Sequence, residues 1–396
     1  MNSLRRKGGS TLIERDLGMR LTELSTWYPV VSVTGPRQSG KSTLVKAVFS
    51  EYRYVNLEDP ATRARANTDP TGFVATLPDR TIIDEAQYAP EVFSAIQARV
   101  DKNSTPGQFV LSGSQNFLLL RKIKQSLAGR VGIAYLLPLS FGEIVREAPE
   151  TNPYRSILRG SYPALYASDV PTSIFYNNYL DTYITRDVVG YLDVRNERDF
   201  RRFLVACATR AGNLVNYADL ARDVGVSVPT VKSWLSILES SFAVNLLSPY
   251  SANVSKRLAK SPKLYFSDSG LLCHLLGIAS PIELAESEKL GAVFENYVIS
   301  ERIKRAYNNL LHPDLYYYRD DSKIEVDLLD MTDRAKPLLC EIKSRQTYRH
   351  SFARHLEPVA VLLGLREADL QVVYGGDGSF VDNSAAVFGI REWLAL

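Results

Sequence analysis

The chain has 396 residues, of which 45% are hydrophobic and 23% are charged, and its formal net charge is +3. This length predicts two or three globular domains with a sizeable core. The net charge is too small to indicate nucleic-acid binding by itself. The three cysteines, Cys207, Cys273 and Cys340, lie far apart with no C-x-x-C pair, which argues against a disulfide framework and a zinc ribbon and is typical of a reducing compartment.

The N-terminal segment and the hydropathy of the chain predict a cytoplasmic protein. The basic stretch from Met1 to Arg6 leads into Lys-Gly-Gly-Ser and not into an apolar segment, so we expect no signal peptide. No apolar run approaches the roughly 18 residues that span a membrane, so we expect no membrane partner.

A phosphate-binding motif lies between the first expected strand and the helix after it. An amphipathic helix is expected up to residue 27, residues 30–33 form an apolar strand, and residues 43–48 form a helix. Between strand and helix stands G-x-x-x-x-G-K-S, which consists of Gly35, Pro36, Arg37, Gln38, Ser39, Gly40, Lys41 and Ser42. This order is the context that a phosphate-binding loop requires.

Each position of the motif has a chemical role. The glycines let the backbone curl so that N–H groups point at phosphate oxygens, and the start of the helix adds donors and a positive dipole end. Lys41 would contact the outer phosphates during catalysis, and Ser42 would supply a hydroxyl to Mg²⁺. Thr43 completes the nucleotide-binding set.

Two carboxylates end a later apolar stretch. After a strand expected at residues 52–57, the β-branched run at 80–86 ends in Asp84 and Glu85. In P-loop NTPases we expect this strand beside the phosphate-loop strand, so that Asp84 holds Mg²⁺ and Glu85 polarises the attacking water. Solvated acids at a strand end are the alternative. Because a small-molecule kinase needs no water-activating glutamate, the pair favours hydrolysis of ATP over a kinase reaction.

Further candidate residues lie at the polar end of the next strand, expected at residues 108–116. Ser114, with Asn116 as second choice, could sense the γ-phosphate between the loop and the acids, although a plain strand-end turn explains either residue equally well. Arg130 precedes a strand at 132–137 and could be an arginine finger, whereas a structural arginine is the commoner case. Ser140 and Glu143 have the spacing of a capping box.

These motifs together resemble one family, the prokaryotic AAA-type ATPases that carry a C-terminal domain of unknown function. The resemblance implies a P-loop NTPase with ATP and Mg²⁺ as ligands. Because a finger such as Arg130 acts across a subunit boundary in ring ATPases, a homo-oligomer and a single working chain both stay open. The motifs that carry the resemblance occur in one order at residues 35–43, 82–87, 111–114, 127–130, 138–143 (without Gly142), 160–163 and 183–188.

The middle of the chain, from residue 171 to about 241, has a helical pattern. Apolar residues recur there at three- and four-residue spacing, and core packing explains them better than base stacking. Residues 216–238 show a short helix, a glycine turn and a second helix that Ser227 can cap, which is the helix-turn-helix pattern. The apolar residues of the first helical face are Tyr176, Tyr179, Leu180, Tyr183 and Ile184.

Two strands after this pattern resemble the wing of a winged-helix domain. They are expected at residues 242–247 and 263–266, and the loop between them carries cations that could grip DNA phosphates. A structural lid is the alternative, since winged helices often serve as one in AAA-type ATPases, and the second helix offers few base-reading groups beyond Lys232 and Ser233. The loop cations are Lys256, Arg257, Lys260 and Lys263.

The C-terminal third combines three carboxylates with a lysine. A long helix expected at residues 282–307 carries Glu295, and the strands that follow carry Asp327 and then Glu341-x-Lys343. Because Glu341 and Lys343 share one strand face, the set resembles the constellation of PD-(D/E)xK nucleases, in which Asp327 and Glu341 would hold a metal ion. Glu295 would be a further or outer ligand, and Glu325 an alternative one.

The remaining C-terminal elements are expected to complete this domain. The pattern predicts strands at 315–319, 324–329 and 337–343, a helix at 352–363, and a strand at 370–374 that closes the domain. His312, His350 and His355 have no metal-ligand spacing, and we interpret them as surface residues.

We therefore expect an α/β protein in three parts: a P-loop NTPase parallel sheet in residues 1–150, a helical winged-helix domain in 151–275, and a restriction-endonuclease-like domain in 276–396. The leading hypothesis is an ATPase that couples ATP hydrolysis to a DNA-binding, and in one version DNA-cleaving, C-terminal region. The alternative is an ATP-switched regulatory or binding protein with a catalytically silent nuclease-like domain.

Overall fold

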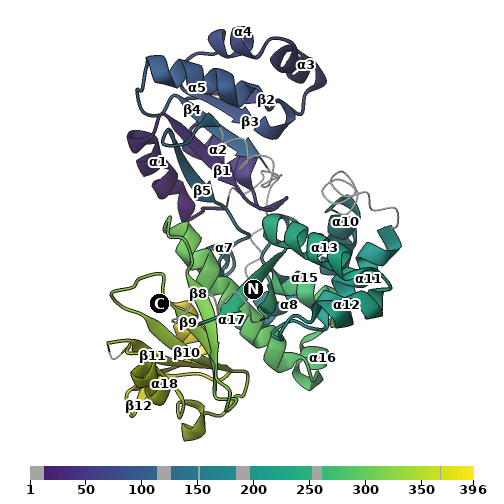
Figure 1. Ribbon diagram of the computed structural model, residues 1–396, viewed down its shortest axis with the longest axis vertical. Coiled ribbons are helices and arrows are strands. Elements are labelled where there is room, and N and C mark those ends of the chain that lie inside the picture. The colour runs from purple at the N-terminus through teal and green to yellow at the C-terminus, as the bar shows by residue number, and fades with distance from the viewer. Residues whose placement is uncertain (1–12, 114–125, 150–151, 184–196, 252–260, 366) are drawn as a thin grey trace, which may run out of the picture.

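The computed structural model describes residues 13–113, 126–149, 152–183, 197–251, 261–365 and 367–396. Figure 1 shows a parallel sheet with its helices at one end of the molecule, a helical middle region, and a second, mixed sheet at the other end. The three-part order therefore follows the expected one, while the domain boundaries themselves stay a prediction.

The N-terminal sheet has five parallel strands in the order β2-β3-β4-β1-β5. The expectation that the acidic strand lies beside the phosphate-loop strand is wrong, because β4 pairs with both and separates them. The polar end of β4 is thereby placed between the loop and the acids. The strands are β1 (Val30–Thr34), β2 (Arg53–Asn56), β3 (Thr81–Asp84), β4 (Phe109–Gly113) and β5 (Val131–Tyr135).

Helices cover both faces of this sheet, as they must for buried parallel strands with continuous apolar runs. One apolar cluster joins Val31 and Val33 to α1 and α2, and another joins Val30 and Ile83 to α5. The helices of this part are α1 (Leu17–Trp27), α2 (Lys41–Val48), α3 (Pro60–Thr68), α4 (Pro70–Ala75) and α5 (Val92–Lys102), with the 3₁₀ turn η1 (Ala86–Tyr88).

The middle region is helical, and its local signals are realised. The capping box of Ser140 and Glu143 is formed at the start of α7. Asn216 caps α12, Gly225 adopts φ 84° at its end, and the Ser227 side chain accepts a hydrogen bond from the Thr230 N–H at the start of α13. The helices are α7 (Phe141–Glu147), α8 (Pro153–Arg159), α9 (Ala164–Ala167), α10 (Thr172–Tyr183), α11 (Glu197–Ala208), α12 (Tyr217–Val224), α13 (Val228–Ser240) and α15 (Ser269–Leu275).

The apolar face of α10 belongs to the core, as expected. Tyr176, Tyr179 and Leu180 are buried. The Tyr179 hydroxyl accepts a hydrogen bond from Tyr162, and the Tyr176 hydroxyl donates one to Asp268. The side chains of Tyr183 and Ile184 lie outside the described residues.

The expected wing is not a free hairpin. Its strands, β6 (Val244–Pro249) and β7 (Lys263–Phe266), pair with each other, and β6 also pairs with β8 (Leu315–Arg319) at the edge of the C-terminal sheet. Lys263 is buried in this arrangement, so its ammonium group cannot contact DNA phosphates as expected. Lys256, Arg257 and Lys260 lie outside the described residues.

The C-terminal sheet has eight strands in the order β12-β13-β11-β10-β9-β8-β6-β7. The strand expected to close the domain, β11, does not end it. A hairpin extends the sheet beyond β11, and a short helix follows that hairpin. The other elements are β9 (Glu325–Asp330), β10 (Leu338–Lys343), η3 (His350–Phe352), α18 (Leu356–Leu362), β11 (Asp369–Tyr374), β12 (Ser379–Asp382), β13 (Ala385–Gly389) and α19 (Ile390–Leu394).

One long helix connects all three parts. The expected helix at 282–307 is divided into α16 (Pro281–Glu286) and α17 (Leu290–Asn308). In Figure 1, α17 runs through the centre of the molecule, and it contacts α1 and β5 of the first sheet, α8 and α15 of the middle region, and β7 and β10 of the second sheet. This placement puts α17 between the two candidate sites described next.

Candidate functional site

The phosphate-loop residues form a curled turn between β1 and α2. Gly35 has φ 153°, and a Cβ there would lie 2.1 Å from the carbonyl oxygen of Leu136, the residue after β5, so only glycine fits at this position. Gln38 and Gly40 both adopt positive φ, at 60° and 92°, which turns successive backbone amides toward one concave side. The loop therefore has the backbone conformation that a phosphate cradle needs.

Lys41 begins α2 and is buried against its own loop. Its Nζ donates hydrogen bonds to the carbonyl oxygens of Gly35 at 3.0 Å and Pro36 at 2.7 Å. Within the described part of the chain, the buried Ser39 hydroxyl has no hydrogen-bond partner. The loop therefore has a buried hydroxyl that no described group of the protein binds, and it fits a polyphosphate with its Mg²⁺. Ser42 and Thr43 follow on the first turn of α2.

Asp84 and Glu85 lie at the C-terminal end of β3, at the same sheet edge as the loop. Asp84 is buried and accepts hydrogen bonds from the Tyr54 hydroxyl at 2.6 Å and from the Ser112 hydroxyl. Glu85 adopts φ 54° and accepts a hydrogen bond from the Gln87 side chain. A non-glycine residue in this conformation is held by its surroundings, which aims the Glu85 carboxylate differently from that of Asp84.

The remaining candidates of the nucleotide site have different outcomes. Ser114 and Asn116 lie outside the described residues. Arg130 precedes β5, and its carbonyl accepts the Val30 amide at the opposite edge of the sheet from the phosphate loop. Its side chain binds Asp101 and the Ala128 carbonyl. Arg130 therefore cannot reach the phosphates of its own chain, and a role toward a neighbouring copy stays a prediction.

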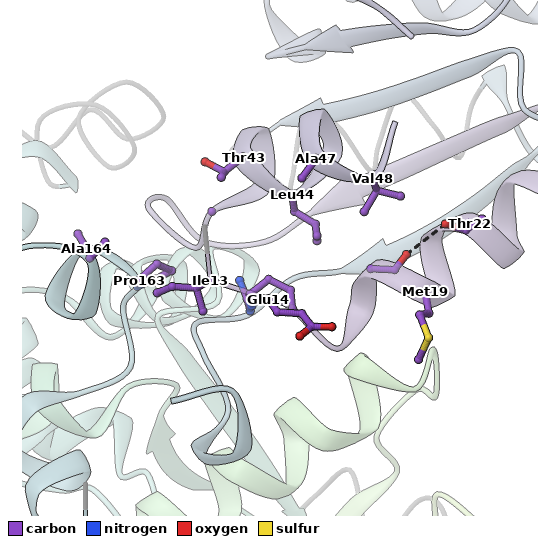
Figure 2. A pocket seen from close by; sticks show the side chains of 14 residues that line it. Ile13, Glu14, Met19, Thr22, Thr43, Leu44, Ala47, Val48, Pro163 and Ala164 are labelled. Carbon is purple, nitrogen blue, oxygen red and sulfur yellow. Dashed lines mark hydrogen bonds between the residues drawn. The ribbon is translucent and has the colours of Figure 1, made fainter. Parts of the chain in front are cut away.

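A pocket of about 440 Å³ adjoins the phosphate loop. Figure 2 shows Thr43, Leu44 and Ala47 of α2 on one wall, and Pro163 with Ala164 of the middle region on the other. The volume and the mostly apolar lining are those of a small-molecule site with few polar groups. The segment 13–15 and helix α1 complete it, so the N-terminal segment contributes to the site together with α2.

Arg15 links this pocket and the loop to the middle region. It is buried, and its guanidinium donates to the Ser39 carbonyl at 2.7 Å and to the Leu137 carbonyl at 2.7 Å. Its Nε pairs with the fully buried Glu143 at 3.0 Å. The position of the loop is therefore tied to the capping residue at the start of α7.

A second buried pair continues from the start of α7 into α17. The Phe141 amide donates to Glu301 at 2.8 Å, and Glu301 pairs with Lys304 at 2.7 Å. The Lys304 ammonium also donates to the Leu139 carbonyl and to the Ser161 hydroxyl, which in turn binds Asp268. We call the set Arg15, Glu143, Glu301 and Lys304 the buried relay.

Further along α17, Glu295 enters a cluster of carboxylates and lysines. Lys343 contacts Asp327 at 2.8 Å and also Glu341. Lys263 contacts Glu295 at 3.3 Å and also Glu325. The structure therefore brings together Glu295, Glu325, Asp327, Glu341 and Lys343, and it adds Lys263, which the sequence analysis assigned to a loop surface. We call these six residues the carboxylate–lysine cluster.

The electrostatics of this cluster are those of a crowded, buried site. Burial and the charge of Asp327 raise the pKa of Glu341, and the same two causes raise the pKa of Glu295. Burial also opposes ionisation of Asp327, but the positive charges of Lys343 and Lys263 outweigh it and lower its pKa. Four carboxylates therefore share two ammonium groups, and the raised pKa values of Glu295 and Glu341 favour their protonated forms, which relieves negative charge.

The carboxylates of the cluster are paired with lysines. Lys343 contacts both Asp327 and Glu341, and within the described ranges no group of three or more His, Cys, Asp or Glu side chains is placed to hold a metal ion. Metal ligation by Asp327, Glu341 and Glu295 stays a prediction.

Several residues of these sites had no local signal in the sequence. Arg15, Tyr54 and Lys263 reach their partners only through the folded sheet order. The histidines expected at the surface follow the expectation in part. His312 and His350 are exposed and contact Tyr135 and Asp382, whereas His355 is half-buried.

Three family models match successive parts of the chain. An AAA domain matches residues 28–145, a domain of unknown function (DUF8612) matches 151–281, and another domain of unknown function (DUF4143) matches 290–393. The first and last matches confirm the expected AAA-type ATPase domain followed by a domain of unknown function. They do not show a nuclease fold.

Two relatives span nearly the whole chain. The uncharacterized protein Rv2008c of Mycobacterium tuberculosis and the uncharacterized protein Mb2031c of Mycobacterium bovis are each 34% identical over 377 residues, which is 93% of this chain and 82% of theirs. Among solved structures, the Walker-type ATPase PABY2304 of Pyrococcus abyssi has a TM-score of 0.44 and 16% identity, over 67% of this chain and 96% of its own. That likeness is too distant to carry an argument.

No helix in the described ranges is long and apolar enough to cross a membrane.

Proposed function

Because this chain belongs to the same family as the uncharacterized mycobacterial proteins and carries an AAA domain, we propose that it is a Mg²⁺-dependent ATPase. The observation that carries the proposal is the meeting of the phosphate loop, Asp84 and Glu85 at one edge of a parallel sheet, beside a pocket of about 440 Å³. Loss of phosphate release in a Lys41 variant is the test.

The side chains divide the chemistry of hydrolysis among themselves. The Lys41 ammonium, already desolvated against the loop, exchanges its carbonyl partners for phosphate oxygens and neutralises charge there. Ser42 and Asp84 would hold Mg²⁺, which when bound offsets phosphate charge and orients the nucleotide. Glu85 accepts a proton from water at its carboxylate, and the Gln87 contact holds that carboxylate in place. The pocket of Figure 2 takes the base.

The buried relay supports coupling between ATP and the C-terminal region. Its members are almost fully removed from water, so each depends on its partner for charge compensation. A shift of the loop at Ser39 would strain Arg15 and Glu143, and through the start of α7 it would act on Glu301. Because Glu295 lies on the same helix as Glu301, such a shift also reaches the carboxylate–lysine cluster.

Hydrogen–deuterium exchange tests this coupling with the double variant E301Q/K304M. In the unaltered protein, ATPγS with Mg²⁺ is expected to change exchange in the AAA domain, in α17 and in strands β9 and β10. In the variant, the change is expected to stay within the AAA domain while ATPγS still binds. The double change is used because removal of one buried charge alone costs about 3–5 kcal/mol of folding free energy, whereas removal of both is often neutral.

The exposed Glu288, which lies just before α17, provides the matched control, and E288Q should respond like the unaltered protein. A variant E301Q/K304M that transmits the full change to β9 and β10 would show that the buried relay carries no coupling.

The second candidate function concerns the carboxylate–lysine cluster. Its residue types resemble a nuclease centre, but both lysines already pair with its carboxylates, and this observation favours a catalytically silent, ATP-switched binding domain. We expect no Mg²⁺- or Mn²⁺-dependent cleavage of duplex or single-stranded DNA by the purified protein. Cleavage that disappears in both D327A and K343A, but not in the exposed control E357Q, would restore the nuclease hypothesis.

A further inference from the structure

A strongly basic segment follows the carboxylate–lysine cluster directly. Between Glu341 and Glu357 the chain has four Lys or Arg residues and two histidines but no acid. Arg345 and Arg349 are exposed, as is Arg354. In the described part of the chain, no carboxylate forms an ion pair with any of these three guanidinium groups. The Arg354 side chain donates a hydrogen bond to the His355 ring at 2.8 Å, so its charge is not neutralised by that contact. Three exposed arginines without a carboxylate partner within ten positions form an electrostatic footprint for a polyanion.

The backbone of this segment is held in place, which leaves the arginines to face solvent. The Gly375 amide donates to the carbonyl oxygens of Lys343 and Arg345, and a Cβ at Gly375 would lie 2.4 Å from the Ser344 carbonyl oxygen. Gln346 donates to the Tyr154 hydroxyl at 2.7 Å. The arginines therefore project from an ordered surface, so binding need not order the backbone first.

Two aromatic residues of the segment, Tyr348 and Phe352, anchor it to the rest of the C-terminal domain, and Tyr348 contacts an exposed aromatic ring. Phe352 packs into the C-terminal core, and Tyr348 packs edge-on against Phe380 with ring centroids 5.0 Å apart. Phe380, on the edge strand β12, remains 43% exposed. The exposed ring thus packs on the residue that precedes Arg349 in the chain. Exposed aromatic rings combined with arginines are the surface features on which unpaired bases stack while phosphates are neutralised.

The neighbouring acids do not cancel this charge. Asp382 binds Tyr348 and His350, and Asp320 acts on His355. Burial and the positive charges of Arg354 and Lys343 nevertheless lower the pKa of His355. The basic segment adjoins Lys343, and its own sequence contains no acid between Glu341 and Glu357.

We propose that residues Arg345, Arg349 and Arg354, together with Phe380, form a binding surface for single-stranded nucleic acid. The arginines contact backbone phosphates and Phe380 stacks on a base. The inference deepens the proposed ATP-switched binding function and rests on it, because it names the partner of the C-terminal domain. It requires no metal and no cleavage.

Fluorescence anisotropy with a fluorescein-labelled DNA single strand, and with the same sequence as a duplex, tests the surface in EDTA. The single strand should bind more tightly than the duplex. The variant R345Q/R349Q/R354Q should weaken single-strand binding by at least about tenfold, and the slope of log affinity against log salt should fall by roughly 0.7 per arginine. F380A should weaken it by about tenfold without changing the slope.

A matched control removes the same charge elsewhere. R53Q/R65Q/K102Q changes three exposed cations of the AAA domain and should bind like the unaltered protein. ATP turnover of both triple variants should be unchanged, which checks their folding and separates this inference from the ATPase proposal.

Absence of binding, or unchanged binding by R345Q/R349Q/R354Q, would overturn the surface. A loss of single-strand binding in K232Q, on the helix-turn-helix, in place of the triple variant would also overturn it. So would competition by polyglutamate as strong as that by unlabelled single strand, since this would indicate an acidic protein partner. The protein could bind single strands through the three arginines and yet cleave no DNA. This result would support the inference and contradict the nuclease hypothesis.

Discussion

Lys41→Ala is expected to abolish ATP turnover, with a loss on the order of 10²–10³-fold or more in phosphate release at saturating ATP. The Lys41 Nζ is buried and lies 2.7 Å from the Pro36 carbonyl oxygen and 3.0 Å from that of Gly35. Removal of this ammonium deprives the cradle of the lysine charge at the outer phosphates, where negative charge gathers during hydrolysis.

The exposed Lys102 on α5 offers a control with the same change of charge. Lys102→Ala should turn over ATP like the unaltered protein, and thermal unfolding should show that both variants are folded. If Lys41→Ala hydrolyses ATP at an undiminished rate, the phosphate loop is not the hydrolytic site and the ATPase proposal fails.

Glu85→Gln is expected to slow hydrolysis by about 10²–10⁴-fold while ATP binding is retained. The substitution keeps the size of the side chain but removes the carboxylate that accepts a proton from water. It leaves Asp84, Tyr54 and Ser112 in place, so the proposed metal position is undisturbed. Single-turnover kinetics and the affinity for ATP, measured on the same variant, separate chemistry from binding.

The exposed Glu51, just before β2, is the matched control for this change. Glu51→Gln should alter neither rate nor affinity. A Glu85→Gln enzyme that turns over normally would show that another group positions the water, whereas one that fails to bind ATP would show that Glu85 supports the nucleotide and not the water.

Local motifs predicted local backbone structure well, because that structure depends on residues that are close in the chain. The residues from Gly35 to Ser42 are consecutive, and their curled backbone depends on glycine freedom within the same segment. The capping box of Ser140 and Glu143 is likewise formed within four residues. The helix-turn-helix pattern follows from caps and a glycine turn, which act over a single turn of helix.

Predictions that depended on neighbours across the fold fared worse. The sequence carries no sign that β4 lies between β1 and β3, because strand order is decided by the packing of whole elements. The wing hairpin was recognised as two strands, but its edge pairs with β8, and Lys263 is thereby drawn into the carboxylate–lysine cluster. Likewise, Arg130 fits a finger motif, whereas its strand places it at the far edge of the sheet.

The sequence by itself determined that this protein has a glycine-containing loop between a strand and a helix, two acids at the end of a later strand, and a C-terminal set of carboxylates with a lysine. Such residues are recognised by type and spacing, which the chain carries in one dimension. Tertiary structure decided what those residues contact: Arg15 beneath the loop, Glu301 and Lys304 along α17, and two lysines within the carboxylates. Buried charges take their role from the partners that replace water, and only the fold supplies those partners.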